Sequence, residues 1–335
     1  MTTTFPPTQA AGKANVPCFF VVGPPRGGTT MLRLLLNSHP EVCVPPETVF
    51  FPFLLRNVES YGDFGTRERI EAFARDVAAA SAETGQTVAT VFSTSPEEIA
   101  AAVEAAKVSC YAEAYAAFMG LVSRRQEKRI WGDKTPFYTA FIEVLAQCFP
   151  NAQFIALVRD PRDVAESLHR TEWGRKWYPS LLDAGMRWRY AITAIERAAP
   201  RLGPERLLAV RYEDLVADSG RWARDICGFL HLEFDERMLR FHETATREVP
   251  EGSKAWHQST LQPISGSRIG RWKQRYSPEE IGLIEIACKG EMRRWGYEPE
   301  GHSLTPANLG RLASWQLSYL RGRIAWTYWN KPRAA

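Results

Sequence analysis

The chain has 335 residues, of which 45% are hydrophobic and 24% are charged, and its formal net charge at pH 7 is +4. This length and composition allow a sizeable core and lie near the upper end for one α/β domain. The small net charge argues against nucleic acid as a partner, and no apolar run approaches the ~20 residues that a membrane-spanning helix needs.

The N-terminal residues 1–16 are polar and contain Pro and Thr, so we expect them to be mobile. They have neither the charged n-region nor the apolar h-region of a secretory signal, which favours a cytoplasmic location. The six cysteines are scattered without a C-x-x-C pair, and we expect reduced core residues. These cysteines are Cys18, Cys43, Cys110, Cys148, Cys227 and Cys288.

The first predicted elements are a buried strand over 18–22, a glycine-rich turn with the sequence GPPRGGTT over 23–30, and a helix from about residue 29 to 38. Backbone N–H groups and a helix N-terminus make such a turn a phosphate site. An ATP-binding P-loop has lysine after its second glycine, whereas this chain has Thr29 there and carries its cation inside the turn. The anion therefore differs from the γ-phosphate of a triphosphate. The candidate ligands are Arg26, Gly27, Gly28, Thr29 and Thr30.

A proline pair breaks the chain ahead of Glu47, and residues 66–125 are predicted to be helical, with a capping box over 95–98. The stretch 54–125 lies between the turn and the next strand. It is either a helical acceptor-side insertion or structural packing. A short strand around 129–132 then precedes Lys134, and a helix follows to residue 148.

Two further strands are predicted over 153–158 and 206–211, with a helix over roughly 181–199 between them. Alternating strands and helices predict an α/β fold with a P-loop-like parallel sheet flanked by helices on both faces. Ligands of such sheets bind at the carboxyl ends of the strands. The turn 23–30 and Arg159 both lie at such ends.

The turn and the segment VRDPRDVAES over 158–167 together resemble the two donor motifs of sulfotransferases that use 3′-phosphoadenosine 5′-phosphosulfate (PAPS). The resemblance runs from about residue 18 to 296 and implies a sulfotransferase domain over 17–300. It implies that the turn holds the 5′-phosphosulfate and that Arg159 and Ser167 hold the 3′-phosphate.

Two later segments extend this resemblance. Tyr212, in the sequence YED, corresponds to a tyrosine near the adenine, although core packing is an open alternative. The segment SGSRIGRWK over 265–273 resembles a basic loop that folds over the 3′-phosphate. Arg268 and Lys273 would supply charge there, and the loop's glycines would permit closure.

The catalytic candidates are Glu47, Lys134 and Arg26. The sequence PPET over 45–48 resembles the segment bearing the catalytic glutamate of tyrosylprotein sulfotransferases, and DKTPF over 133–137 resembles the segment with their catalytic lysine. The resemblance implies Glu47 as general base for an in-line displacement, with Lys134 at the leaving oxygen. A solvated loop carboxylate is the alternative for Glu47.

Other candidates have simpler interpretations. His39 is expected to pack or hydrogen-bond at a helix end. Asp160 and Asp163 are expected to be ordinary partners of a helix dipole, and no metal is needed for this chemistry.

The acceptor is left open because Val44 and Gly132 stand where tyrosylprotein sulfotransferases have bonded cysteines, and Val49 replaces their arginine. A small-molecule, lipid or glycan hydroxyl, or an amine, is expected. A homo-oligomer is also open.

The segment 301–335 is basic and rich in Trp, with five basic and no acidic residues after residue 309. A membrane-surface anchor is one interpretation, and a final helix packed on the domain is the favoured one.

Two alternative functions are considered. A nucleotide kinase or other phosphotransferase would need lysine at position 29. A non-catalytic nucleotide-binding protein would not need both Glu47 and Lys134.

Overall fold

The computed structural model describes residues 11–82, 86–249 and 258–301, together with 306, 308–310 and 312–314. These residues divide into two compact units. The larger unit holds residues 11–159 and 191–267, and the smaller unit holds 160–190 and the described residues from 268 onward.

The larger unit is built on a five-stranded sheet with the order β2-β3-β1-β4-β5, in which all neighbouring strands are parallel. Every residue of the central strand β1 is buried, which explains its unbroken apolar sequence. The predicted α/β class and parallel sheet are confirmed. The strands are β1 (Cys18–Val22), β2 (Val42–Cys43), β3 (Ile130–Lys134), β4 (Gln153–Val158) and β5 (Leu207–Arg211).

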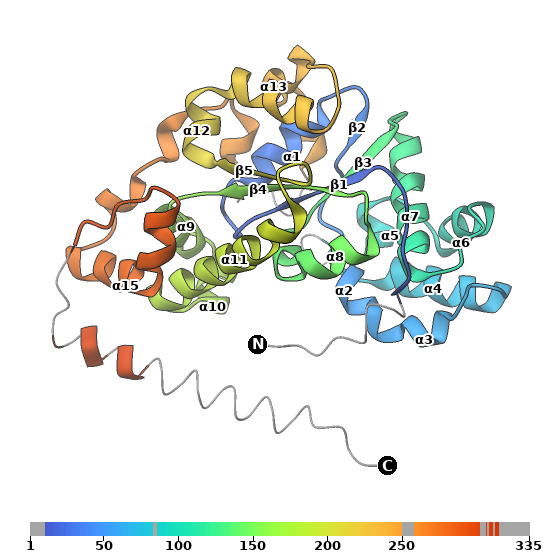
Figure 1. The fold of residues 1–335 in the computed structure, drawn as a ribbon, viewed down its shortest axis with the longest axis horizontal. Helices are drawn as coiled ribbons and strands as arrows, with labels where there is room; N and C mark the ends of the chain where they lie inside the picture. The colour runs from blue at the N-terminus through green and yellow to red at the C-terminus, as the bar shows by residue number, and fades with distance from the viewer. Residues whose placement is uncertain are drawn as a thin grey trace, which may run out of the picture. The chain divides into compact units, whose positions relative to one another are not determined.

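Helices cover both faces of this sheet (Figure 1). On one face lie α1 (Thr29–Asn37), α12 (Tyr212–Ala217) and α13 (Ser219–Phe229). On the other lie α8 (Ile142–Cys148) and the part of α11 (Leu181–Leu202) that belongs to the larger unit.

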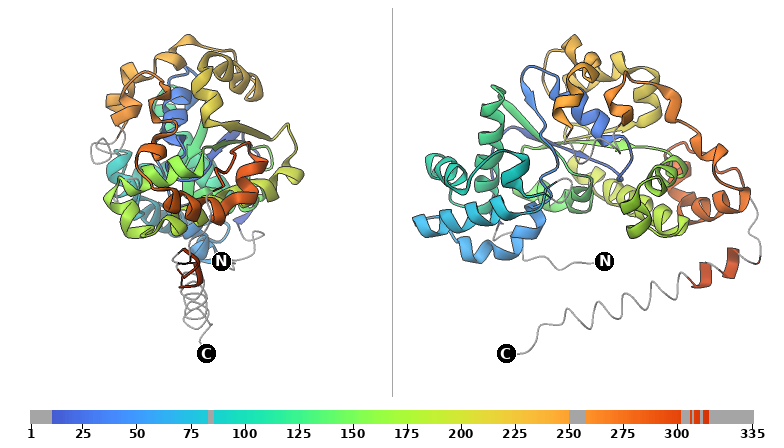
Figure 2. Two further views of the ribbon diagram at one scale, coloured as in Figure 1. Left: turned by 90° about the vertical axis from the view of Figure 1, so that its left-hand side faces the viewer. Right: turned by 180° about the vertical axis from the view of Figure 1, so that it is seen from behind.

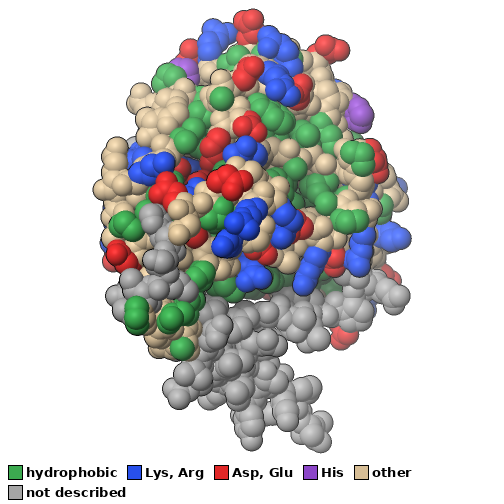
Figure 3. Space-filling view, turned by 60° about the vertical axis from the view of Figure 1, so that its left-hand side comes forward, with side chains coloured by type: hydrophobic (Ala, Val, Ile, Leu, Met, Phe, Trp, Pro, Cys, Tyr) green, Lys and Arg blue, Asp and Glu red, His purple; other side chains and the backbone are tan. Residues whose placement is uncertain are grey.

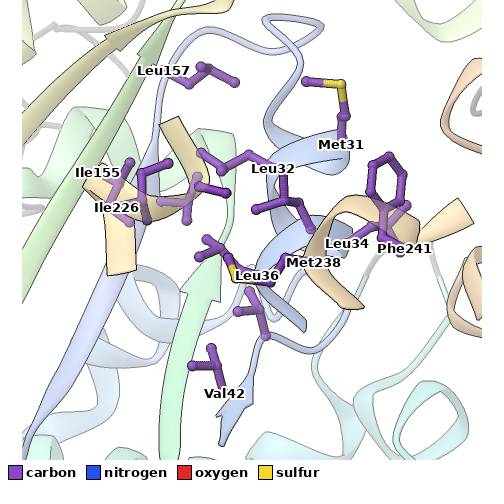
Figure 4. Packing of buried hydrophobic residues seen from close by; sticks show 14 of the residues in the cluster. Met31, Leu32, Leu34, Leu36, Val42, Ile155, Leu157, Ile226, Met238 and Phe241 are labelled. Atoms are coloured by element: carbon purple, nitrogen blue, oxygen red, sulfur yellow. The ribbon is translucent and has the colours of Figure 1, made fainter. Parts of the chain in front are cut away.

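Helix α1 is anchored by a buried apolar cluster (Figure 4). Leu32, Leu34 and Leu36 of α1 are at most 1% exposed and belong to this cluster together with Ile155 of β4 and Ile226 of α13. Each fully buried side chain of this kind contributes about 1.5–3 kcal/mol. The cluster therefore fixes the helix whose N-terminus follows the glycine-rich turn.

The helical region predicted over 54–125 lies beside the sheet edge formed by β2 and β3 (Figures 1 and 2). The capping box is present, because Glu98 N donates to Ser95 Oγ while the Glu98 carboxylate accepts from Ser95 N. Buried aromatic rings pack α2 against α7. The elements are α2 (Phe51–Leu54), η2 (Leu55–Asn57), α3 (Val58–Tyr61), α4 (Arg67–Ala79), α5 (Val88–Val91), α6 (Pro96–Ala105) and α7 (Tyr111–Arg125).

The smaller unit contains α9 (Pro161–His169), α10 (Glu172–Trp177), the first half of α11 and α15 (Pro278–Arg294). Leu182 of α11 packs against Leu283 and Ala287 of α15.

The other elements in the described part of the chain are η4 (Pro136–Phe141), η5 (Glu236–Arg240), α14 (His242–Glu248), η7 (Gln258–Leu261), η8 (Gly266–Arg268) and η9 (Arg271–Gln274).

The chain ends are described in part. Ala11 and Ala14 are buried, and Ala14 N donates to Cys148 O at 2.8 Å, so this part of segment 1–16 is fixed on the larger unit. Most of segment 301–335 lies outside the described residues. Within the described part of the chain, no helix is long and apolar enough to cross a membrane.

All six cysteines are free, and five are buried as expected. Burial raises the pKa of Cys43 to about 11 and that of Cys148 to about 12, so these thiols stay protonated and unreactive. On the surface, Lys and Arg side chains are interspersed with Asp and Glu side chains over the face shown in Figure 3.

Candidate functional site

The glycine-rich turn joins β1 to α1 in a backbone conformation that needs both of its outer glycines. Gly28 has φ 96° and caps α1, and a Cβ on it would lie 2.4 Å from the ring of Tyr212. A Cβ on Gly23 would lie 2.3 Å from Leu157 O. Between them Arg26 has φ 64°, a left-handed conformation that is uncommon for residues other than glycine. The turn thus leads directly into the N-terminus of α1, whose backbone N–H groups are of the kind that bind anions in other proteins.

Thr139 of η4 braces this turn from the side. Its Oγ1 accepts a hydrogen bond from Gly23 N at 2.8 Å and donates one to Gly23 O at 2.9 Å. Thr139 is 1% exposed. The sequence did not predict this contact, because 116 residues separate the two partners.

The structure brings together Glu47, Lys134 and Thr30. Lys134 ends β3, where it is paired in register with Val21 of β1, and its side chain is fully buried. Its Nζ donates to Glu47 Oε1 and lies 3.4 Å from Thr30 Oγ1 at the start of α1. The Glu47 side chain is 24% exposed. A buried ammonium group needs a charged partner, and here a more accessible carboxylate supplies it.

The backbone after Glu47 is strained. Val49 has φ 55°, which is an outlier for a β-branched residue. Thr48 beside it is completely buried and donates to the carboxylate of Asp133 at 2.6 Å. Neither Thr48 nor Asp133 was among the predicted site residues, and only the chain neighbours Glu47 and Lys134 point to them.

Arg159 follows β4 directly and stacks on Tyr212. Its guanidinium carbon lies 4.4 Å from the ring centroid, and each residue is 6% exposed. The same ring lies against Gly28 of the turn. Tyr212 therefore packs between the turn and Arg159, and its contact with adenine stays a prediction.

The remaining predicted ligands, Ser167, Arg268 and Lys273, belong to the smaller unit. Ser167 is half-buried on α9, and Arg268 is half-buried at the start of the basic loop. Lys273 pairs with Glu300 at 3.2 Å. Arg159 belongs to the larger unit.

The basic loop is tied to α9 of the same unit. The Asp163 carboxylate accepts from Gly270 N at 2.8 Å and from Trp272 N at 3.4 Å, while the guanidinium of Arg162 lies 4.2 Å from the Trp272 ring centroid. Gly270 has φ 73°, so glycine serves the backbone conformation there. Asp160 caps α9 by accepting from Arg162 N, as expected, whereas Asp163 has this additional role.

His39 is 2% exposed; Nε2 bonds to Glu233 O and Nδ1 accepts from Glu41 N. This is the expected structural role at a helix end. Among the residues that the structure describes, no group of three or more His, Cys, Asp or Glu side chains could hold a metal ion.

Comparison with known proteins decides the family. A sequence model of the sulfotransferase family matches residues 17–236. The chain belongs to the sulfotransferase family. This sulfotransferase is 24% identical over 302 residues to protein-tyrosine sulfotransferase 1 of Danio rerio, which covers 89% of this chain and 76% of that relative.

Two more similarities agree with this assignment. The sulfotransferase is 32% identical over 157 residues to the nodulation protein NoeE of Sinorhizobium fredii, covering 46% of this chain and 31% of that protein. The solved sulfotransferase domain from the Synechococcus PCC 7002 olefin synthase superposes with a TM-score of 0.56 at 26% identity, covering 85% of this chain and 98% of that domain. The family predicted from the donor motifs is confirmed. The enzyme is a transferase with PAPS as its co-substrate, and the nucleotide-kinase alternative is rejected.

Proposed function

We propose that this sulfotransferase moves the sulfuryl group of PAPS to an acceptor hydroxyl or amine by in-line displacement, with Glu47 as general base. The observation that supports the proposal most is the cluster of Glu47, Lys134 and Thr30 at the N-terminus of α1. A carboxylate, an ammonium and a phosphate-binding turn meet there, and these are the groups that the reaction needs.

The donor would be held by the turn and by the 3′-phosphate residues. The N–H groups of residues 27–30 and the Arg26 guanidinium would bind the 5′-phosphosulfate, with the hydroxyls of Thr29 and Thr30 as further donors. The Arg159 guanidinium would bind the 3′-phosphate, and Ser167, Arg268 and Lys273 are proposed for the same phosphate.

Glu47 and Lys134 would divide the chemistry between them. Glu47 accepts the proton of the acceptor as its oxygen or nitrogen forms a bond to sulfur. The bond from sulfur to the bridging phosphate oxygen breaks, and Lys134 stabilises the negative charge on that leaving oxygen. In the structure Lys134 donates to Glu47. The leaving phosphate would compete with Glu47 for the Lys134 ammonium. When the donor is bound, Lys134 would then move from Glu47 to the phosphate, and the Glu47 carboxylate would be available as a base.

For the acceptor we propose the hydroxyl of a small molecule, lipid or glycan. The ring of Phe19 lies 2.3–2.7 Å from where a Cβ on Gly132 would be, so a cysteine there would require this ring to move. With Val44 and Gly132 in place of cysteines, this chain lacks the disulfide that the resemblance to tyrosylprotein sulfotransferases implies. Protein tyrosine is the second candidate, because the relative from Danio rerio is named for it. The cytoplasmic location, the membrane-surface contact of the C-terminal segment and a homo-oligomer stay predictions.

The test is transfer of radiolabelled sulfate from PAPS into a panel of phenols, alcohols, amines, glycans, lipids and a tyrosine peptide. We expect Glu47→Gln to lower kcat by about 10²–10⁴-fold, the usual contribution of a general base, while adenosine 3′,5′-bisphosphate still binds. Glu104→Gln, on an exposed position of α6, is the matched control and should transfer normally. Wild-type kcat in Glu47→Gln would remove Glu47 as the base.

A further inference from the structure

Asp133 is a buried carboxyl group that the proposed chemistry does not use. It is 1% exposed and lies in β3 directly before Lys134. Burial raises its pKa. Burying a polar group costs free energy unless hydrogen bonds within the protein replace those to water, so the hydrogen-bond partners of Asp133 indicate its role.

Three hydroxyl groups donate to this carboxylate. Thr48 Oγ1 and Tyr115 OH donate to Oδ2 at 2.6 and 2.5 Å, and Thr135 Oγ1 donates to Oδ1 at 2.7 Å. Because Thr48 gives its proton to Asp133, the hydroxyl of Tyr138, 2.8 Å away, donates to Thr48. All five side chains are buried.

The same chain of hydrogen bonds continues into α2. Tyr138 OH accepts from Phe51 N at 3.0 Å. The backbone N–H of Phe51 therefore donates to Tyr138, Tyr138 donates to Thr48, and Thr48 donates to Asp133. This order fixes each hydroxyl in a single orientation and ties the segment around Thr48 to both α2 and η4.

The network lies behind the proposed catalytic pair. Thr48 follows Glu47 in the chain, and Asp133 precedes Lys134. Neighbouring side chains of a strand point to opposite faces, so Asp133 points away from the face where Lys134 meets Glu47. The two segments are thus joined twice, by Lys134 and Glu47 on one side and by Asp133 and Thr48 on the other.

The strained residue Val49 fits this arrangement. A φ of 55° at a β-branched residue persists only where the surroundings hold it, and the buried hydrogen bonds of Thr48 are next to it in the chain. The left-handed conformation of Val49 changes the direction of the chain directly after Thr48.

We propose that Asp133 is a positioning residue of the transfer reaction, which acts through Thr48 to hold the Glu47 carboxylate against Lys134. This inference rests on the proposed function of Glu47. It assigns Asp133 no proton transfer and no contact with donor or acceptor.

Four variants test the inference, each with kcat, the KM for PAPS, the dissociation constant of adenosine 3′,5′-bisphosphate and the denaturation midpoint measured. Thr48→Val keeps the shape and removes the hydroxyl, and we expect it to lower kcat about 10–100-fold with the bisphosphate affinity retained, because small misplacement of a reacting group has effects of this order. Thr48→Ser keeps the hydroxyl and should restore most of the rate.

Tyr115→Phe is the matched control. It removes another hydrogen bond to the same carboxylate oxygen and a 3.3 Å contact with Thr48 Oγ1, but it leaves the shorter hydrogen bonds of Thr48 to Asp133 and Tyr138 in place. We expect lower stability with nearly unchanged kcat. Equal losses of kcat in Thr48→Val and Tyr115→Phe, or a normal kcat in Thr48→Val, would overturn the inference.

The fourth variant, Tyr138→Phe, covers the case in which Thr48→Val does not fold. Tyr138→Phe removes the hydroxyl that donates to Thr48, and its kcat should fall while Tyr115→Phe transfers normally; an unchanged kcat counts against the inference. Failure of the proposed function would look different, since wild-type enzyme would then transfer no sulfate from PAPS or Glu47→Gln would remain active.

Discussion

At the scale of single residues, Gly28 connects the two proposed anion sites of the larger unit. Its backbone lies against the ring of Tyr212, and the guanidinium of Arg159 stacks on the same ring. A cation over an aromatic face contributes about 0.5–2 kcal/mol, depending on desolvation. Tyr212 therefore sets the distance between the turn and Arg159, which a single nucleotide with two phosphates would have to match.

We predict that Gly28→Ala weakens binding of adenosine 3′,5′-bisphosphate at least tenfold. The φ of 96° strains any other residue, by about 1–3 kcal/mol, and the added Cβ would meet Tyr212 at 2.4 Å. Isothermal titration calorimetry measures the effect. Gly228→Ala is the control, because Gly228 lies in α13 with nothing within 4 Å of the added Cβ and Ala favours a helix. Equal affinity in Gly28→Ala and wild type would contradict the prediction.

The sequence predicted some of these residues and not others for a physical reason. Arg26 and Arg159 lie in short motifs at the ends of apolar strands, and local patterns of this kind are visible in one sequence. Thr139 and Asp133 act on residues that are 116 and 85 positions away. Their hydroxyl or carboxylate has no local signature, and only the folded sheet brings the partners together.

At the scale of elements, the part of the basic loop that lies in the smaller unit, residues 268–273, depends on α9. Asp163 accepts two backbone N–H groups of the loop, and Arg162 stacks on Trp272 while its guanidinium is bonded to Asp160 and Glu285. Arg162 is 5% exposed and Trp272 is 3% exposed, so buried side chains anchor the loop. Its cationic side chains would be presented in place before a ligand arrives.

We predict that Asp163→Asn raises the KM for PAPS about 10–100-fold with little change in kcat. Asn offers one acceptor oxygen in place of two and loses the charge, and a hydrogen bond to a charged group contributes about 1.5–3 kcal/mol. Steady-state kinetics measure the change. The preference for adenosine 3′,5′-bisphosphate over adenosine 5′-monophosphate should fall in parallel, because only the 3′-phosphate would use the loop.

Asp218→Asn is the control for this prediction. Asp218 caps α13 by accepting from Arg221 N, and Asn serves equally well as a cap. Its kinetics should match those of the wild type. A selective fall of kcat in Asp163→Asn, with KM unchanged, would speak against a role of the loop in donor binding.

The elements that were predicted well have strong local patterns. The strand over 18–22 is a continuous apolar run, the strand over 153–158 is apolar after Gln153, and both have the same bounds in the structure, while the capping box at Ser95 begins α6 as expected. The strand β2 was not predicted, because two residues give no periodicity and its place is set by pairing with β3. The position of Ala14 depends in the same way on a partner, Cys148 O, that is distant in the chain.

At the scale of the whole molecule, the buried carboxyl group of Asp133 and the hydrogen-bonded carboxyl group of Asp235 make the free energy of unfolding depend on pH in opposite directions. Burial raises the pKa of Asp133 above its usual value of 3.8. The folded protein therefore binds more protons at this site than the unfolded chain between 3.8 and the raised pKa. The stabilisation is full below about pH 4 and is lost as the pH rises through the pKa of the folded state.

We predict that the free energy of unfolding of wild type, relative to Asp133→Asn, falls as the pH rises from about 4. Asn does not titrate, so the difference between the two curves isolates this carboxyl group. Urea denaturation at a series of pH values measures it. Asp235→Asn gives the opposite control, because hydrogen bonds from Arg237 lower the pKa of Asp235 to about 2. Its contribution is present above about pH 4 and is lost as the pH falls toward 2. If both variants shifted with the same sign, the pKa of Asp133 would be lowered on folding and not raised, because the hydroxyl donors of its network would outweigh the loss of water.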